Sequence, residues 1–245
     1  MPSRPADHRE VYGAAPEQFG ELRLPCGGGP HSVVVLIHGG CWRAEYDITH
    51  VAPLATALAD AGWAVWAIEY RRIGSPGGGW PGTFDDVTNA IAHVRQLAAR
   101  HPLDLARVVV AGHSAGGHLA LWSAAQESFL PRAVVSIAGI TDLATYAAPT
   151  GCGSAVVPLL GGTVGEVPER YAFASPATTP PRVPVQAIIG TADAIVPHAQ
   201  VDALARSTGA RVIVRPVEGA GHFDLVAPDG DAWTALLQAL RAVTG

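Results

Sequence analysis

The 245-residue sequence contains no lysine, so all sixteen of its basic residues are arginines. This absence excludes a Schiff-base lysine, a Ser–Lys dyad and the lysine of a phosphate-binding P-loop. Charged residues are also few, at 15%, whereas hydrophobic residues make up 49%, and this composition excludes an intrinsically disordered chain. The formal net charge of −5 argues against nucleic acid as the main partner.

Cysteine is scarce as well, and its three positions, Cys26, Cys41 and Cys152, lie far apart. An odd number of cysteines without CxxC spacing argues against a disulfide framework and against a zinc site. No apolar run reaches the roughly 18 residues of a membrane span, and residues 1–18 lack the apolar region of a signal peptide. We therefore expect a cytoplasmic protein that binds neither membrane nor nucleic acid and requires no metal or other cofactor. Its oligomeric state is not readable from the sequence.

Short apolar segments alternate with longer helical segments along the chain. Six short segments are rich in β-branched residues: residues 32–38, 64–69, 107–111, 133–138, 185–190 and 211–217. Several of them are apolar throughout, which suits strands buried on both faces of a parallel sheet. Helices are expected at residues 50–61, 84–100, 115–126, 198–207 and 229–243. This alternation predicts an α/β fold with a doubly wound, mostly parallel sheet flanked by helices. We expect residues 19–24 to add an antiparallel edge strand.

The chain shows neither an internal repeat nor an interdomain linker, so we expect residues 1–245 to form a single domain. Residues 139–184 are the one long stretch without a clear periodic pattern, and they are rich in Gly, Pro, Ala and Thr. Long connections in compact domains tend to be functional loops or lids. Any lid in this chain must therefore be small.

A Gly-His-Ser-Ala-Gly sequence at residues 112–116 lies between a predicted strand and a predicted helix. A serine hydroxyl is a weak nucleophile and must be held exposed beside a base. Gly112 and Gly116 leave room for a tight strand–turn–helix that presents Ser114, and the helix N-terminus offers backbone N–H groups to negative charge. We predict that Ser114 is a nucleophile and that the N–H of Ala115 is an oxyanion-hole donor.

A His-Gly-Gly-Cys-Trp sequence at residues 38–42 ends the first of the six strands. Acyl transfer creates an oxyanion that needs donors aimed in advance, and a glycine-rich turn lets backbone N–H groups approach a substrate oxygen closely. We predict that Gly40 and Cys41 supply these loop donors. Trp42 is a tentative substrate contact.

The acid and base follow the last two predicted strands. Asp193 comes after residues 185–190, and His222 comes after residues 211–217. A carboxylate at the carboxyl end of a strand is well placed to accept a hydrogen bond from a histidine N–H. We predict that His222 is the general base and that Asp193 orients it, in the chain order Ser, Asp, His.

Other residues compete for these two roles. His198 is the main alternative base because it is close to Asp193 in sequence, and Asp142 is an alternative acid because it follows the strand at residues 133–138. Asp224 lies only two residues past His222, too near to brace it easily. The remaining histidines near the motifs are expected to be structural, namely His38 within its loop, His113 pointing away from the nucleophile and His118 packed on its helix.

With these motifs, the sequence resembles the HGGxW branch of the α/β-hydrolase family, which includes kynurenine formamidases (arylformamidases), small carboxylesterases and feruloyl-esterase-like proteins. The resemblance spans nearly the whole chain and implies the α/β-hydrolase fold with a minimal lid. Cys41 stands where relatives of the hormone-sensitive-lipase type carry a third glycine.

The resemblance implies hydrolysis of a small carboxylic ester through an acyl-enzyme on Ser114. Its alternative is hydrolysis of an aryl formamide, such as N-formylkynurenine, by the same residues. A hydrolase-fold binding protein without catalysis is a third possibility. It is disfavoured because the nucleophile, base, acid and oxyanion loop are all present in the sequence.

Overall fold

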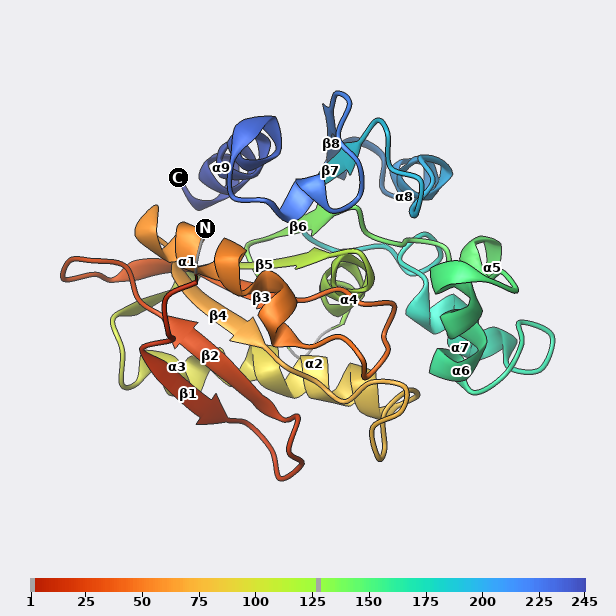
Figure 1. Ribbon diagram of the computed structural model, residues 1–245, viewed down its shortest axis with the longest axis horizontal. Helices are drawn as coiled ribbons and strands as arrows, with labels where there is room; N and C mark the ends of the chain where they lie inside the picture. Colours follow the sequence, from red (N-terminus) through yellow and green to blue (C-terminus); the bar gives the residue numbers. More distant parts are fainter. Residues whose placement is uncertain (1–2, 127–128) are drawn as a thin grey trace.

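The centre of the molecule is a twisted eight-stranded sheet (Figure 1). The computed structural model describes residues 3–126 and 129–245. From one edge to the other, the strands are β1 (His8–Val11), β2 (Phe19–Arg23), β4 (Ala64–Ile68), β3 (His31–Ile37), β5 (Leu103–His113), β6 (Ala133–Ile137), β7 (Val185–Gly190) and β8 (Val212–Val217). Strands β3 to β8 are parallel, whereas β2 pairs antiparallel with both β1 and β4.

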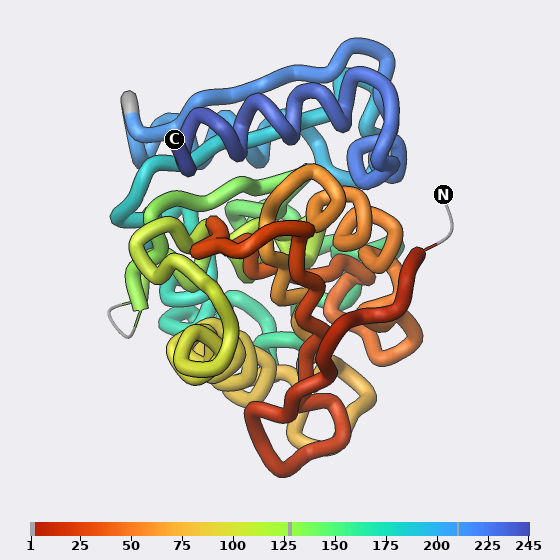
Figure 2. The backbone as a smooth tube through the Cα atoms, turned by 90° about the vertical axis from the view of Figure 1, so that its left-hand side faces the viewer, coloured from red at the N-terminus to blue at the C-terminus, as the bar shows by residue number. Residues whose placement is uncertain are grey.

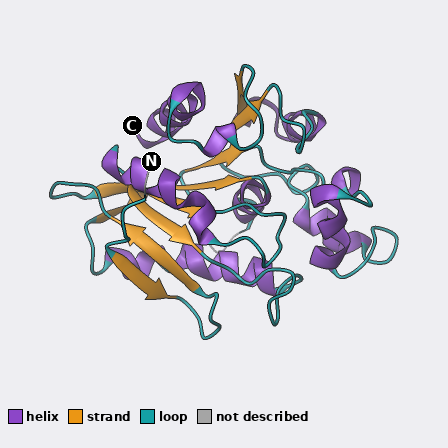
Figure 3. Cartoon of the chain, viewed as in Figure 1, coloured by secondary structure: helices purple, strands orange, loops and turns teal. Residues whose placement is uncertain are grey.

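Helices cover both faces of this sheet, as the orange strands and purple helices of Figure 3 show. One face packs against α1 (Ala52–Asp60) and α9 (Gly230–Thr244), and the other against α2 (Gly82–Ala92), α3 (Val94–Ala98), α4 (Ala115–Ser123) and α8 (Ala199–Thr208). In the side view of Figure 2, α9 lies near the top of the molecule, level with β7 and β8, and the yellow helices α2 and α3 lie toward the bottom. Successive residues of β3 alternate between two buried clusters, with Val33 and Val35 in one and Val34 and Leu36 in the other. This period of two, with both faces buried, explains why residues 33–37 are all apolar.

Residues 139–184 form a group of short helices beside the carboxyl ends of the strands (green, Figure 1). They are α5 (Leu143–Tyr146), η2 (Gly151–Ala155), α6 (Val156–Leu160) and α7 (Pro168–Ala174). Helices of four to seven residues are too short for a periodic pattern to reveal them. The single-turn helices η1 (Ile48–Val51), η3 (Gly209–Arg211) and η4 (Asp224–Val226) complete the described elements.

The six parallel strands and the doubly wound architecture predicted from the sequence are confirmed. Two details are wrong. Strand β2 lies inside the sheet, because β1, which was not predicted, forms the edge. The His-Arg-Glu-Val sequence of β1 is largely exposed, so it shows no apolar face that would indicate a strand. The helix expected at residues 84–100 is divided at His93 into α2 and α3. Among the described residues, no helix is long and apolar enough to cross a membrane.

Candidate active site

The loops that follow β3, β5, β7 and β8 meet around one cavity of about 960 Å³. In open parallel sheets, ligands bind at the carboxyl ends of the strands. Gly40, Ser114 and His222 line this cavity, and each comes from a different one of these loops. The convergence brings together motifs that lie more than 180 residues apart along the chain, because parallel strands all end at the same edge.

Ser114 lies in a strained turn between β5 and α4. Its backbone has φ 56° and ψ −120°, a region that side chains rarely adopt outside functional sites. The Ser114 N–H donates to the Ile137 carbonyl at 2.8 Å, which holds the turn against β6. A side chain at Gly116 would put its Cβ only 2.1 Å from the Ile37 carbonyl oxygen. The turn thus requires glycine there, and α4 begins at Ala115 with its first N–H groups free of intrahelical partners.

The glycine-rich loop after β3 lies directly against this turn. A Cβ added at Gly39 would come within 3.2 Å of the Ser114 Cβ. Gly40 and Cys41 have φ angles of 111° and 52°, and the Arg43 N–H closes the turn by donating to the Gly40 carbonyl at 2.9 Å. Gly40 and Cys41 line the cavity together with Ser114. The residues expected to supply oxyanion donors therefore surround the same space as the serine.

A buried carboxylate that the sequence analysis missed, Glu69, supports this loop. It accepts hydrogen bonds at 2.9 Å from His38 Nε2, from the Ile48 N–H and from the Tyr70 N–H, and the Arg72 guanidinium lies 3.1 Å away. Burial by itself would raise the pKa of Glu69, but the His38 hydrogen bond and the Arg72 charge outweigh it and lower that pKa. The carboxylate therefore stays ionised and anchors the loop. His38 also bonds to the Gly39 carbonyl at 2.7 Å, which confirms the structural role expected for it.

His222 and Asp193 form a short hydrogen bond, with 2.7 Å between Nδ1 and Oδ2. Both side chains are almost fully buried, at 4% and 3% exposure. The other Asp193 oxygen, Oδ1, accepts from the N–H groups of Ile195 and Val196 at 2.8 and 2.9 Å, so the carboxylate cannot rotate freely. With the Nδ1 proton directed to Asp193, the Nε2 lone pair of His222 is available as a base.

Two further histidines, His50 and His113, hold the backbone of His222 in place. His113 Nε2 donates to the His222 carbonyl at 3.1 Å, and its Nδ1 lies 3.1 Å from His50 Nε2. Because a carbonyl can only accept, His113 Nδ1 must accept from His50. Burial lowers the pKa of His113 well below its ordinary value and also lowers the pKa of His50, which suits this neutral chain of donors. His113 is thus structural, although it also lines the cavity.

The alternative acid and base residues are engaged in local backbone contacts. His198 Nε2 donates to the Gly190 carbonyl at 3.0 Å. Asp142 caps α5 by accepting from the Ala144 and Thr145 N–H groups, and Asp224 accepts from the Gly221 N–H at 2.8 Å. In the part of the chain that the structure describes, no group of three or more His, Cys, Asp or Glu residues is arranged to hold a metal ion.

The expectation that Trp42 contacts substrate is corrected by its burial. The ring is 0% exposed and belongs to the core, and its Nε1 donates to His118 Nδ1 at 3.2 Å. His118 in turn donates from Nε2 to the Ala174 carbonyl at 2.8 Å. These hydrogen bonds join the loop after β3 to α4 and α7, so the buried tryptophan anchors that loop to the core.

Burial lowers the pKa of His118 to about 4, which predicts a loss of stability in acid. The pKa of His118 is lower in the folded protein than its value of about 6.5 in the unfolded chain. As the pH falls from about 6.5 toward 4, the unfolded chain therefore binds the proton more readily, which stabilises it relative to the folded protein. We expect the free energy of unfolding to be about 2 kcal/mol smaller at pH 5 than at pH 7.5 from this group alone. Urea denaturation at both pH values measures the difference. The difference should shrink by this amount in His118→Gln, whose amide cannot titrate; an unchanged difference would contradict the assignment.

Contrary to the sequence expectation, Cys41 and Cys152 form a disulfide, with their Cα atoms 5.1 Å apart. The two cysteines are 111 residues apart, so sequence spacing could not reveal their contact. The bridge joins the loop after β3 to η2. Disulfides persist mainly in oxidising compartments, so the bridge does not favour the cytoplasmic location expected from the lack of a signal-peptide region and of a membrane span. That location stays a prediction. Cys26 is free and exposed.

Replacing Cys152 by serine should destabilise the fold. Opening a loop of this length gives the unfolded chain more freedom, and the loss of a native disulfide typically costs about 2–5 kcal/mol. Chemical denaturation of Cys152→Ser and of the wild type, with and without reductant, measures the effect. Cys26→Ser is the matched control, because it removes a thiol without touching the bridge. Equal stability of the oxidised and reduced wild type would show that the bridge contributes nothing.

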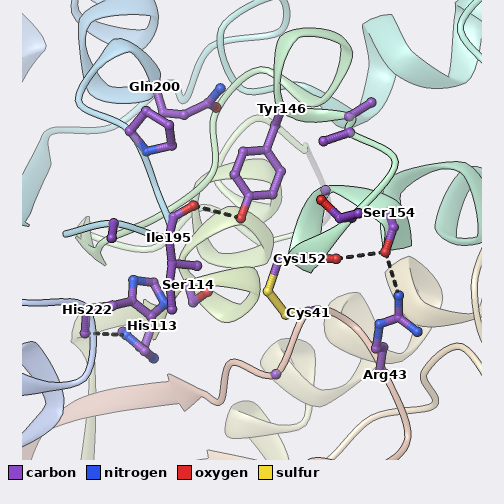
Figure 4. Close-up of a pocket in the computed structure, with 18 of the residues that line it drawn as sticks. Cys41, Arg43, His113, Ser114, Tyr146, Cys152, Ser154, Ile195, Gln200 and His222 are labelled. Atoms are coloured by element: carbon purple, nitrogen blue, oxygen red, sulfur yellow. Dashed lines mark hydrogen bonds between the residues drawn. A yellow bond between two sulfur atoms is a disulfide. The ribbon is translucent and has the colours of Figure 1, made fainter.

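The wall of the cavity opposite Ser114 and His222 comes from the segment of short helices after β6 (Figure 4). Tyr146 donates from its hydroxyl to the Ile195 carbonyl at 3.2 Å, which ties α5 to the loop that carries Asp193. Burial raises the pKa of Tyr146 to about 12, so the hydroxyl remains a donor. The lining residues from this segment occupy no recognisable motif, so the sequence did not indicate that any of them, Cys152 included, belongs to the site.

Comparisons with known proteins agree with this geometry. The model of the BD-FAE family matches residues 23–207. The probable carboxylic ester hydrolase LipM of Mycobacterium tuberculosis is 29% identical over 232 residues, covering 85% of this chain and 53% of LipM. Esterase LipC of the same organism is 29% identical over 245 residues, covering 89% of this chain and 60% of LipC. A solved structure described as a truncated form of a carbohydrate esterase from gut microbiota aligns with a TM-score of 0.82 at 22% identity, covering 98% of this chain and 99% of that one.

The chain spans little more than half the length of the two mycobacterial relatives. The similarity to the solved esterase structure, at 22% sequence identity, is evidence for the fold alone. The match to the family model covers well over half of the chain and shows the family. The protein therefore has the α/β-hydrolase fold and belongs to the BD-FAE family.

Proposed function

We propose that this protein is a serine hydrolase that cleaves small carboxylic esters, with Ser114 as nucleophile, His222 as general base and Asp193 as the orienting acid. The observation that supports this proposal most directly is the 2.7 Å hydrogen bond from His222 Nδ1 to Asp193 Oδ2, beside a cavity that Ser114 also lines. The relatives named as ester hydrolases support the same reaction. We also propose that residues 1–245 act as one domain on a small-molecule substrate.

Catalysis would begin with proton transfer from Ser114 Oγ to His222 Nε2 as Oγ attacks the ester carbonyl carbon. The carbonyl oxygen becomes an oxyanion, for which the N–H groups of Gly40, Cys41 and Ala115 are the proposed donors. Collapse of this intermediate breaks the bond to the alcohol, which leaves with the proton from His222. Water then attacks the acyl-enzyme with His222 again as base, releasing the carboxylic acid and restoring the serine hydroxyl.

Asp193 would stabilise the imidazolium that forms during each proton transfer. Its position is prepared before substrate arrives, because Oδ1 is held by two backbone N–H groups and Oδ2 by His222. A carboxylate held in this way keeps the imidazole in the tautomer with the proton on Nδ1. No reorganisation of the acid is then needed at the moment of reaction.

The formamide alternative has no specific observation in its favour. A formyl group needs little room on the acyl side, so a tight pocket would favour it, whereas this cavity measures about 960 Å³. The two matched mycobacterial proteins are named as ester hydrolases. We therefore propose ester hydrolysis as the activity of this site.

Rates on short p-nitrophenyl esters and on N-formylkynurenine test this proposal. We expect ester hydrolysis to be faster by orders of magnitude in kcat/KM, together with covalent labelling by a fluorophosphonate probe. A faster reaction with the formamide would move the assignment to arylformamidase. An unlabelled protein that hydrolyses neither substrate would instead support a binding protein without catalysis.

A further inference from the structure

One charged side chain, that of Arg43, lines the cavity of the proposed active site. Among the described residues of the lining there is no aspartate or glutamate, although the protein as a whole carries a formal charge of −5. The acid of the proposed triad, Asp193, lies behind His222 and outside this lining. Among the described lining residues, the one formal charge is therefore positive, although the protein as a whole is acidic.

Two chain segments joined by the disulfide hold the guanidinium of Arg43 in place. Arg43 follows Cys41 by two residues, and its Nη2 donates at 2.9 Å to Ser154 Oγ, two residues after Cys152. Ser154 itself donates to the Gly151 carbonyl at 2.7 Å, which leaves its oxygen free to accept from the arginine. Arg43 also pairs by its backbone with Ile73. The guanidinium is thus fixed relative to the oxyanion loop.

The charge of Arg43 has no counterion in the part of the chain that the structure describes, where no carboxylate lies within 4.0 Å of it. Some arginines of this protein are paired with carboxylates, among them Arg71 with Asp86, Arg72 with Glu69 and Arg107 with Asp104. Others hydrogen-bond to neutral carbonyl or amide oxygens, as Arg132, Arg170 and Arg215 do, but none of these lines the cavity. A guanidinium carries five N–H donors in a rigid fork that matches a carboxylate. Only one donor of Arg43 has a described side-chain partner, the neutral Ser154.

We propose that Arg43 binds an anionic group on the substrate, so that preferred substrates are esters that also carry a carboxylate away from the reacting carbonyl. This inference rests on the proposed esterase function and names its substrate class. In Figure 4 the disulfide lies between Ser114 and the Arg43–Ser154 pair. The anionic group would therefore bind beyond the bridge, at the end of the cavity away from the nucleophile.

Matched pairs of esters test the proposal. One series places the charge on the acyl side, as mono-p-nitrophenyl adipate and suberate, each compared with its neutral methyl ester. The other places it on the leaving group, as 4-carboxyphenyl butyrate compared with its methyl ester. We expect wild-type kcat/KM to favour the charged member of at least one series by about tenfold, the effect of one charge-assisted hydrogen-bonded pair. This ratio should fall as the salt concentration rises.

Arg43→Met should remove the preference, lowering kcat/KM for the charged ester about tenfold more than for its neutral partner. Arg95→Met is the control, because it removes the same charge from an exposed position on α3 and should leave the ratio unchanged. Arg43→Glu should reverse the preference toward butyrylcholine, whose leaving group is cationic. Should either Arg43 variant fail to fold, the wild-type ratio and its salt dependence still decide the question.

The kinetic results that would contradict the role of Arg43 differ from those that would contradict the esterase function. Efficient hydrolysis of the neutral esters with no preference for a charged member of either series would overturn the role of Arg43 and leave the esterase intact. The same holds if Arg43→Met and Arg95→Met give equal ratios. Loss of the proposed function would instead appear as no hydrolysis of any ester by the wild type.

Discussion

Replacing Ser114 by alanine is expected to lower kcat for p-nitrophenyl ester hydrolysis by about 10⁴- to 10⁶-fold, because the reaction loses its covalent nucleophile. The residual rate would come from the oxyanion donors and from substrate binding, which do not depend on the hydroxyl. Steady-state rates and fluorophosphonate labelling both measure the effect. Labelling should disappear together with activity.

The fold should tolerate this substitution. The turn is held by backbone contacts, namely the Ser114 N–H to the Ile137 carbonyl and the His118 N–H to the Ser114 carbonyl, and alanine retains both. The left-handed φ of 56° costs alanine and serine similar strain, since both have a Cβ. Ser207→Ala, in α8, is the control and should retain wild-type rates and labelling. A Ser114→Ala protein with activity within tenfold of the wild type would remove Ser114 as the nucleophile.

Asp193→Asn is expected to lower kcat by about 10⁴-fold at neutral pH, although the two side chains have nearly the same shape. In the wild type, Oδ1 accepts from the Ile195 and Val196 N–H groups, and Oδ2 accepts from His222. The asparagine oxygen should keep the two backbone bonds, which turns its NH₂ group toward His222. That group can only donate, so His222 would carry its proton on Nε2 and could not take one from Ser114.

Asp142→Asn is the matched control for this substitution. Asp142 is the alternative acid suggested by the sequence, and it caps α5 through two backbone N–H groups, a role that asparagine fills equally well. We expect its kcat to stay within a few-fold of the wild type. A large loss in Asp142→Asn, with a small one in Asp193→Asn, would transfer the role of the acid to Asp142.

The parallel strands and the motifs at their ends could be predicted from the sequence because each is a local pattern. The part of a strand that is buried on both faces is apolar, as residues 33–37 of β3 and the whole of β4 are, and glycines mark turns such as the one that follows β3. Gly116 illustrates the physical constraint, since the tight contact with the Ile37 carbonyl excludes any side chain there. Once the strands are parallel, the residues just after them must meet at one edge.

Other features had no local signal. The His-Arg-Glu-Val strand β1 is mostly exposed and shows no apolar face, and the short helices α5 to α7 complete too few turns to show a period. Trp42 follows Cys41 in the glycine-rich loop after β3, so its position in the sequence suggests that it lines the cavity. Its burial against His118 depends on how α4 packs, which no pattern within the loop could indicate.

The sequence by itself determined the fold class, the order of the strands along the chain and the candidate nucleophile, base, acid and oxyanion loop. Only the tertiary structure decided that Cys41 bonds to Cys152, that Glu69 anchors the oxyanion loop and that Arg43 lines the cavity without a counterion. The physical reason is separation along the chain. A strand or a turn is specified by residues that are neighbours in sequence, whereas a disulfide, a buried ion pair and the charge of a cavity depend on side chains that meet only after folding.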